Sequence, residues 1–344
     1  MSLTYNEIKS QYEALTRTME YVDARLPEID ALLRDCGQLV YVGCGSSYAV
    51  AISGALAAWS RLGRPATAIP AGDLLLHADT YRPVLEGCAL VVLSRSGETS
   101  EILRAVERVR RMDLNCRILS VICAEGTALA AYSDCTLEMP WAFDRSVCQT
   151  RTVSCLYLFC AYCAANLAGH EGLAADLRAA VAEGPAFMSA NEPALKAVAQ
   201  GGWTHALVLG DAELSGLCEE GALAFKEICQ VPSNYYHLLD MRHGPMVLVG
   251  AKTLVIAVLS DAQSKLELDL LRDIAAKGAA VVAYSDEPLD MPGVVSVSFG
   301  RKLTHPARGI PAIAICQLIS YYKSFHTGAN PDQPDGLSPW IALA

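Results

Sequence analysis

The chain alternates between short apolar runs and longer amphipathic stretches. In the first half, the apolar runs lie at 38–42, 66–69, 89–93, 117–122 and 136–139. Unbroken apolar runs of this length are typical of parallel strands covered on both faces. The stretch that begins near Glu98 and ends near Arg111 has one apolar and one charged face, as an amphipathic helix has. Strands alternating with helices predict an α/β fold with a doubly wound, mainly parallel sheet flanked by helices.

The same alternation begins again after a polar passage. Strands are expected at 204–210, 253–260 and 279–284, and helices at 213–230 and 263–277. Val-Leu-Ser occurs at 92–94 and again at 258–260, which indicates an internal repeat. The sequence therefore predicts a helical lead-in at 1–35, a first domain at 36–170, a linker region at 171–193, a second domain at 194–330, and a C-terminal tail or lid at 331–344.

The stretch from Ser94 to Ser100 separates a buried strand from an amphipathic helix. It places the hydroxyls of Ser94, Ser96 and Thr99 beside Gly97 and the free N–H groups of a helix start. A single helix cap needs only one hydroxyl. We therefore expect an anion site here, for which phosphate is the favoured ligand, rather than capping alone.

A glycine turn, Gly43-Cys-Gly-Ser-Ser47, follows the first strand. Its Gly-x-Gly is a weak signal for a dinucleotide, because Tyr48 stands where a third glycine is expected and the next strand ends at Pro70 without an acidic residue for a ribose. Phosphate contact by Ser46 and Ser47 fits better. Residues 144–151 repeat this chemistry at another helix start, although Thr150 as an ordinary cap explains them equally well.

Two stretches of the second half offer acid/base groups. Glu220 and Glu227 are seven residues apart on one side of a helix, and carboxylates on an apolar helix face are costly unless paired or used. His243 lies beside Arg242 in a turn and is a candidate acid/base group. From spacing alone, solvated glutamates and a structural histidine remain the alternatives.

Composition narrows the range of partners. The 344 residues are 52% hydrophobic and carry a net charge of −10, which argues against nucleic acid. The 13 scattered cysteines and the polar first residues predict reduced thiols in a cytoplasmic protein. The pair Cys160 and Cys163 lies in an apolar helix, where packing is expected, and that run is too short to span a membrane. No metal and no cofactor are expected.

Six motifs occur together and in order. They are Cys-Gly-Ser-Ser at 44–47, Ser-Arg-Ser-Gly-Glu-Thr at 94–99, Ser-Val-Cys-Gln-Thr-Arg at 146–151, Glu-Gly-Ala-Leu-Ala-Phe-Lys-Glu at 220–227, His-Gly-Pro at 243–245 and Asp-Gln-Pro at 332–334. With them the chain resembles the tandem sugar isomerase (SIS) domain proteins. It is similar to the isomerase half of glucosamine-6-phosphate synthase and to AgaS-type phosphosugar isomerases and deaminases.

The resemblance implies roles for individual residues. The sugar phosphate would be bound by Ser47, Ser94, Arg95, Ser96 and Thr99, and other substrate contacts would come from Ser46, Val147, Gln149 and Ser338. Glu227 would move the proton between C1 and C2, with Glu220 as a further catalytic candidate. His243 would help open the sugar ring, and in this family it can come from the neighbouring subunit of a homodimer.

The chain departs from the synthase at informative positions. Pro339 stands where the synthase carries a lysine, and Arg95 stands where it has glutamine. No glutaminase half with a nucleophilic N-terminal cysteine is present, so glutamine-dependent synthesis is not expected. The sequence predicts a sugar-phosphate aldose–ketose isomerase or isomerising deaminase or deglycase, acting through an enediol. A non-catalytic sugar-phosphate sensor is the alternative.

Overall fold

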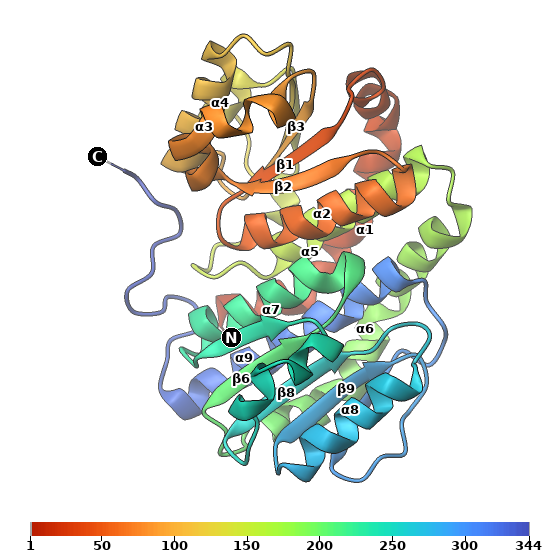
Figure 1. Cartoon of the computed structure of the whole chain (residues 1–344). Coiled ribbons are helices and arrows are strands. Elements are labelled where there is room, and N and C mark those ends of the chain that lie inside the picture. The colour runs from red at the N-terminus through yellow and green to blue at the C-terminus, as the bar shows by residue number, and fades with distance from the viewer. Residues whose placement is uncertain (1, 344) are drawn as a thin grey trace. The chain divides into compact units, whose positions relative to one another are not determined.

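The structure, a computed structural model, describes residues 2–343, which form two compact units. We call the first the N-unit; of the described residues it contains 10–145, 149–175 and 338–343. The second, the C-unit, contains 2–9, 146–148 and 176–337. Each unit is built on one parallel sheet (Figure 1).

The N-unit sheet has five strands in the order β2-β1-β3-β4-β5, and every neighbouring pair is parallel. The strands are β1 (Leu39–Gly43), β2 (Ala66–Pro70), β3 (Ala89–Ser94), β4 (Arg117–Ile122) and β5 (Cys135–Glu138). The helices are α2 (Ser46–Leu62), α3 (Ala71–Leu85), α4 (Ser100–Arg111), α5 (Arg151–Leu167) and most of α1 (Leu3–Leu33). Every residue of β1 and β3 is buried, as the unbroken apolar runs predict.

Close helix packing covers one face of this sheet. Helix α2 packs against α5, and a Cβ at Gly54 would come within 3.0 Å of the Tyr41 ring on β1 and of Cys160 on α5. Cys160 and Cys163 are buried among the apolar residues of α5, as predicted. All 13 cysteines are free thiols, and Cys44 and Cys116 are the two that are partly exposed.

The C-unit sheet has the order β10-β9-β8-β6-β7 and is also parallel throughout. Its strands are β6 (His205–Leu209), β7 (Ser233–Tyr236), β8 (Thr253–Val258), β9 (Ala280–Ser285) and β10 (Val294–Ser298). Its helices are α7 (Ser215–Ile228), α8 (Lys265–Ala276), α9 (Gly309–Thr327) and most of α6 (Glu171–Ala199). Short 3₁₀ helices occur at Ala128–Tyr132, Pro140–Ala142, Ala212–Leu214, Leu239–Arg242, Pro245–Leu248 and His305–Arg308.

The two sheets have the same topology. In each, the first strand in sequence lies between the second and the third, and the fourth and fifth follow beyond the third. The order of the connections therefore reverses between β1 and β3 in the N-unit and between β6 and β8 in the C-unit. Ligands of doubly wound sheets bind at the carboxyl ends of strands at such switch points.

The structure differs from the sequence prediction in places. The predicted linker region, 171–193, belongs to helix α6, which continues through Pro185 and Pro193. Strands β7 and β10 and helix α3 were not predicted. Strand β7 reads Ser-Asn-Tyr-Tyr and is largely unburied, whereas α3 is kinked at His77 and contains Pro83, so neither shows a clear hydrophobic period.

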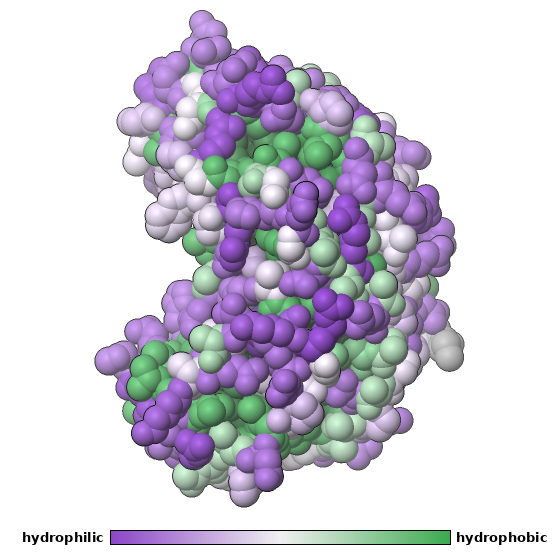
Figure 2. All heavy atoms as spheres, turned by 90° about the vertical axis from the view of Figure 1, so that its right-hand side faces the viewer, coloured by the Kyte–Doolittle hydropathy of each residue, from purple (hydrophilic) through white to green (hydrophobic). Residues whose placement is uncertain are grey.

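Polar side chains dominate the molecular face shown in Figure 2, with hydrophobic residues in scattered groups between them. Within residues 2–343, no helix combines the length and the apolar character that a membrane span requires.

Candidate active site

The loops after β1 and β3 lie at the switch point of the N-unit sheet. These strands are neighbours and parallel, with Val42 paired to Val92, so both loops leave the same edge of the sheet. The loop after β1 leads into α2, and the loop after β3 leads into α4. The structure thus brings the Ser46–Ser47 turn and the Ser94–Thr99 loop to one edge, which is the position where ligands of this fold class bind.

Two glycines allow these loops to turn closely. Gly97 has a φ of 66°, and a Cβ there would lie 2.3 Å from Thr127 Oγ1. A Cβ at Gly43 would lie 2.5 Å from the backbone carbon of Ser47. Any side chain at either position would push the loop away, so the backbone curvature of the candidate site depends on glycine.

The loop hydroxyls do not serve as helix caps. Ser94 Oγ accepts a hydrogen bond from the N–H of Gly97 at 2.9 Å, and Ser96 Oγ accepts one from the N–H of Glu98 at 3.2 Å. Thr99 occupies the N-cap position of α4 without a side-chain cap hydrogen bond. A serine hydroxyl that accepts still has its own O–H to donate. Capping alone therefore does not account for this loop, and its hydroxyl donors remain suited to an anion.

The turn after β1 adds two more hydroxyls. Ser46 and Ser47 begin α2, whose N-cap residue is Gly45, so no side chain caps this helix either. Both serines are 3% exposed, so little of either residue is accessible to solvent. Their position at an uncapped helix start, beside the loop after β3, makes both hydroxyls candidates for ligand contact.

The C-terminal tail lies against the same loop. The Arg95 guanidinium donates to the carbonyl of Pro339, and the N–H of Ser100 donates to the carbonyl of Ile341 at 3.2 Å. The N–H of Leu343 donates to Ser100 Oγ at 3.0 Å. Backbone groups of the tail thus lie over the helix start, and closure of the tail over a ligand stays a prediction. Ser338 is exposed, and its contact with substrate stays a prediction.

A cavity of about 510 Å³ opens close to this loop and has Arg145, Arg151 and Phe143 in its wall. The Arg95 guanidinium lies 6.0 Å from the centre of the Phe143 ring, so the loop and the cavity share this wall. Cys123, also in the wall, donates its N–H to the Ser94 carbonyl at 3.1 Å. Three arginines therefore surround the carboxyl edge of the N-unit sheet, on a chain whose net charge is −10.

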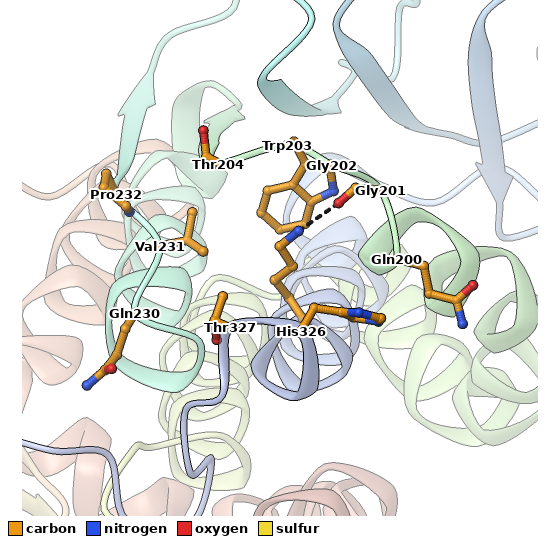
Figure 3. Close-up of a pocket in the computed structure, with 11 residues that line it drawn as sticks. Gln200, Gly201, Gly202, Trp203, Thr204, Gln230, Val231, Pro232, His326 and Thr327 are labelled. Atoms are coloured by element: carbon orange, nitrogen blue, oxygen red, sulfur yellow. Dashed lines mark hydrogen bonds between the residues drawn. The ribbon is translucent and has the colours of Figure 1, made fainter.

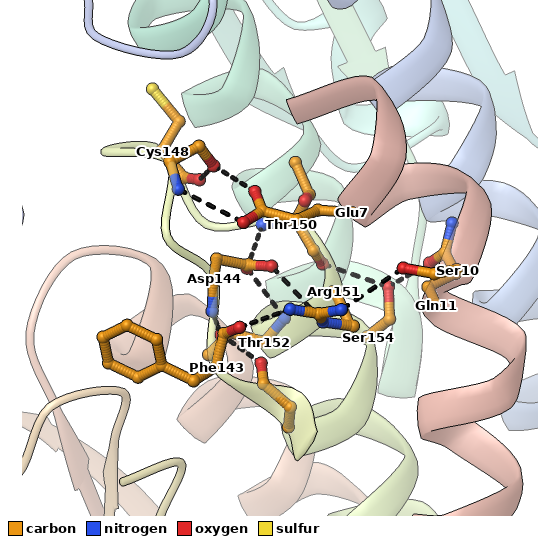
Figure 4. A network of polar contacts seen from close by, with 12 residues as sticks. Glu7, Ser10, Gln11, Phe143, Asp144, Cys148, Thr150, Arg151, Thr152 and Ser154 are labelled. Atoms are coloured by element: carbon orange, nitrogen blue, oxygen red, sulfur yellow. Dashed lines mark hydrogen bonds and ion pairs between the residues drawn. The ribbon is translucent and has the colours of Figure 1, made fainter. Parts of the chain in front are cut away.

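At the start of α5 the sequence left an anion site and an ordinary Thr150 cap as alternatives, and the structure shows a carboxylate of the chain there (Figure 4). Asp144 Oδ2 accepts from the N–H groups of Thr150 and Thr152 at 2.7 and 2.9 Å. Arg151 lies 3.7 Å from Asp144 and donates to Ser10 Oγ at 3.2 Å. The buried Asp144 carboxylate therefore does what an external anion would do at this helix start.

The remaining residues of that motif lie in different surroundings. Val147 belongs to the C-unit, where its N–H donates to the Asp332 carbonyl at 3.0 Å. Gln149 belongs to the N-unit, and its buried Oε1 has no hydrogen-bond partner among residues 2–343. The substrate contacts expected of Val147 and Gln149 stay predictions.

The candidate acid/base groups all belong to the C-unit. Glu220 is 1% exposed in α7, near Cys316 of α9, whose pKa is raised to about 12 by burial and further by the Glu220 charge. Glu227 lies half-buried in the last turn of the same helix. Burial lowers the pKa of Lys226, although the charges of the neighbouring glutamates, Glu227 included, act to raise it. Helix α7 thus carries Glu220 in a buried, apolar environment and Glu227 in a partly exposed one.

His243 lies on an exposed turn. Its backbone N–H donates to the Asp240 carbonyl at 2.9 Å, and Gly244 follows it with a φ of 118°. Arg242, which precedes it, forms an ion pair with Asp273 of α8. An exposed imidazole is available to a ligand or to another subunit.

Sequence reasoning missed two residues at the N-unit site. Thr127 packs against Gly97, and its buried hydroxyl has no hydrogen-bond partner in the described part of the chain. Ser100 contributes both an N–H and a hydroxyl at the start of α4. Thr127 lies 30 residues beyond Gly97 in sequence, so no local pattern links them. No group of three or more metal-ligating side chains occurs among residues 2–343.

Comparison with known proteins identifies what this chain is similar to. The SIS domain family matches residues 32–161, which include every strand of the N-unit sheet. Glutamine–fructose-6-phosphate aminotransferase (isomerizing) of Shewanella oneidensis is 26% identical over 361 residues, covering 98% of this chain and 58% of that protein. The chain therefore spans little more than half the length of the curated relatives it matches.

Two solved structures share the fold along almost the whole chain. Glucosamine-6-phosphate deaminase from Thermotoga maritima has a TM-score of 0.80 at 24% identity, covering 99% of this chain and 100% of that one. Tagatose-6-phosphate ketose/aldose isomerase from Escherichia coli has a TM-score of 0.84 at 23% identity, covering 99% and 98%. The resemblance to SIS-domain proteins indicated by the six motifs is confirmed, and residues 32–161 are the part of the chain that matches the SIS domain.

Proposed function

We propose that this chain is a sugar-phosphate isomerase acting on a sugar or amino-sugar 6-phosphate. The observation that carries the proposal is the start of α4, where the serine hydroxyls, Arg95 and the backbone N–H groups lie together and the N–H groups of Gly97, Glu98 and Ser100 donate to hydroxyl and carbonyl oxygens rather than to a carboxylate. Glu101 in the first turn of α4 is the nearby acid, and its buried Oε2 has no hydrogen-bond partner among residues 2–343. The names of the similar proteins, an isomerizing aminotransferase, a deaminase and a ketose/aldose isomerase, support the same class of substrate.

In this proposal the N-unit binds the phosphate. Ser94, Ser96 and Thr99 donate their hydroxyls to phosphate oxygens, and Ser47 does the same from the start of α2. Each hydrogen bond to a charged group contributes about 1.5–3 kcal/mol to the free energy of binding, so these donors together stabilise the bound phosphate. Arg95 adds a charge-assisted donor once it exchanges the Pro339 carbonyl for the ligand.

Glu227 acts as the base that moves a proton between C1 and C2. The carboxylate removes the proton from C2 of the open-chain aldose while the carbonyl oxygen at C1 gains a proton, which gives the enediol. The protonated carboxyl then returns its proton to C1 while the hydroxyl at C2 loses its proton, which gives the ketose. His243 assists ring opening by proton transfer to the ring oxygen. A group that transfers a proton must contact the substrate, and Glu220 is only 1% exposed. We therefore assign Glu220 an indirect role, in which its charge acts on the neighbouring groups of α7.

The enediol route needs no covalent attachment to the enzyme. A Schiff base requires a primary amine at the sugar carbonyl, and the tail that contacts the loop carries Pro339 where the synthase has its lysine. We expect borohydride treatment of the enzyme with its phosphosugar to leave the intact mass unchanged. A stable adduct on any lysine would replace this mechanism with imine chemistry.

A homodimer is part of the proposal. Val247 and Leu248, four and five residues after His243, are 85% and 42% exposed and adjacent in sequence, which fits an interface with a second copy. If His243 acts across that interface, mixing inactive Glu227→Gln chains with inactive His243→Ala chains restores part of the activity. A fully active monomer in sedimentation would contradict the shared site.

The experiment that tests the function is turnover of a panel of aldose, ketose and amino-sugar 6-phosphates in deuterated water, followed by NMR. Aldose–ketose isomerisation incorporates deuterium at C1 or C2 without release of ammonia. An isomerising deaminase or deglycase releases the amine from the amino sugar. Binding of a phosphosugar without turnover of any member of the panel would instead make the chain a sensor.

A further inference from the structure

A second pocket, of about 510 Å³, lies in the C-unit at the amino ends of β6 and β7 (Figure 3). Its wall comes from three segments: residues 200–204 before β6, residues 230–232 before β7, and the last turns of α9. None of these residues has a role in the proposed isomerase chemistry. The pocket is at the opposite edge of its sheet from the carboxyl ends where ligands of this fold class usually bind.

A buried lysine forms part of the wall. Lys323 is 5% exposed, and its Nζ donates to the Gly201 carbonyl at 2.7 Å and lies 4.0 Å from the centre of the Trp203 ring. An ammonium group has three donors, and no carboxylate within residues 2–343 forms an ion pair with this one. Lysines are almost never buried without a compensating charge.

The electrostatics of the pocket favour an anion. Burial lowers the pKa of Lys323, which means that the protonated form lacks stabilisation that an anionic ligand would supply. His326 also lines the pocket, and exposed Lys252 donates to the Gly202 carbonyl at 3.4 Å beside it. No aspartate or glutamate lines the pocket, although the chain as a whole carries ten net negative charges.

The rim adds a strained residue. Gln230 adopts a φ of 54°, a left-handed conformation that favours glycine, and its side-chain amide donates to the Asp335 carbonyl at 3.2 Å. A non-glycine residue held in this region costs free energy, and such residues concentrate at ligand sites. Gln230 and Gln200 also line the pocket, and Figure 3 shows their side chains pointing away from its centre.

We propose that this pocket binds a small organic anion, a carboxylate or a phosphate ester, whose charge pairs with the Lys323 ammonium. The volume suits a metabolite rather than a macromolecule. The Trp203 ring and the apolar Val231 and Pro232 in the wall fit a ligand that carries an apolar part beside its charged group. The proposal does not depend on the isomerase activity.

The test uses Trp203 as a local reporter. Protein labelled with 5-fluorotryptophan gives one fluorine NMR signal for each of its four tryptophans, and Trp203→Phe assigns the relevant one. Citrate and inorganic phosphate are titrated as separate probes against sodium chloride at equal ionic strength. We expect citrate, phosphate or both to shift the Trp203 signal saturably in the wild-type protein, while chloride does not. The two arms tell a carboxylate site from a phosphate site.

Variants then test the lysine. Lys323→Met should weaken the probe by about tenfold or more, because it removes a charged hydrogen-bond donor. Lys277→Met makes the same change of charge at the exposed end of α8 and should leave the titration unchanged. No saturable Trp203 shift in the wild-type protein, or an equal shift with chloride, would overturn the proposal whether or not Lys323→Met folds. So would an unchanged titration in a folded Lys323→Met protein.

Discussion

The loop after β3 and the loop after β8 hold equivalent positions in two sheets of the same strand order, and both follow the tripeptide Val-Leu-Ser. In the C-unit, the Glu267 carboxylate closes the loop from within. It accepts from the N–H and hydroxyl of Ser260 at 2.7 and 2.8 Å, and from the N–H of Ser264 at 2.6 Å. In the N-unit loop, the N–H groups of Gly97 and Glu98 donate to serine hydroxyls, and the N–H of Ser100 donates to the Ile341 carbonyl of the tail.

One helix position accounts for much of this difference. The third residue of α8 is Glu267, which completes a capping box with Ser264. The third residue of α4 is Ile102, which is buried in the core against the sheet. A carboxylate at this position satisfies the helix start permanently, whereas an apolar residue leaves the N–H groups to other acceptors. The repeat therefore contains one self-filled loop and one loop suited to an external anion.

Two other helix starts follow the self-filled pattern. Asp144 serves α5, and Asp332 serves α1 by accepting from the N–H groups of Leu3 and Thr4 at 3.0 and 2.9 Å. Asp332 belongs to the Asp-Gln-Pro motif, which thereby has a structural role inside the C-unit. A carboxylate of the chain is the common solution in this protein, and the start of α4 departs from it.

The largest expected effect concerns the assignment of chemistry to the C-unit. Glu227→Gln should lower the isomerisation rate by about 10²–10⁴-fold, because a positioned base contributes that much, while phosphosugar binding persists. Glu219→Gln, a change of the same kind on the same helix, should stay close to wild type. Hydrogen exchange at C1 or C2 in deuterated water measures the step directly. Persistent exchange in Glu227→Gln would transfer the role to Glu220 or His243.

A smaller effect is expected from opening the self-filled loop. Glu267→Gln turns an amide N–H₂ toward the donors of Ser260 and Ser264, so the free energy of unfolding should fall by about 1–3 kcal/mol. Glu287→Gln removes an exposed acid of the same unit and serves as the control. Urea unfolding provides the measurement. Equal midpoints for the two variants would mean that Glu267 does not hold the loop.

The smallest effect concerns acid. Burial acts to raise the pKa of Asp332, but hydrogen bonds from Ser2, Leu3 and Thr4 outweigh it and lower the pKa below its usual 3.8. The stability that this carboxylate contributes is therefore present above pH 3.8 and is lost as the pH falls through the lowered pKa. Asp332→Asn should lower the Tm at neutral pH and flatten its decline in acid, whereas exposed Asp335→Asn should do neither.

The regular parts of both sheets could be predicted from the sequence. The unbroken apolar runs located β1, β3 and β4 to within a residue or two, because strands buried on both faces leave that pattern. The hydroxyl cluster before α4 was visible for the same local reason. Strand β7 was missed because Ser-Asn-Tyr-Tyr is polar and lies at the edge of its sheet.

The pairing of helix starts with carboxylates could not be predicted. Asp332 accepts from the N–H of Thr4, more than 300 residues away in sequence. Asp144 accepts from the N–H of Thr150 across a turn whose shape the sequence does not specify. Lys323 was visible only as a lysine in an apolar helix, since its pocket is formed by three separate segments. Such contacts depend on tertiary structure rather than on local period or propensity.

The central claim is that the two equivalent loops differ in function, and calorimetric titration of a matched pair of variants tests it most directly. The titrant is the phosphosugar that the panel identifies. Ser94→Ala should weaken its binding by about 10- to 100-fold through loss of a charged hydrogen bond. Ser260→Ala, the equivalent change in the C-unit, should leave the affinity unchanged and lower only the stability. Equal affinities for the two variants, or a loss confined to Ser260→Ala, would contradict the account.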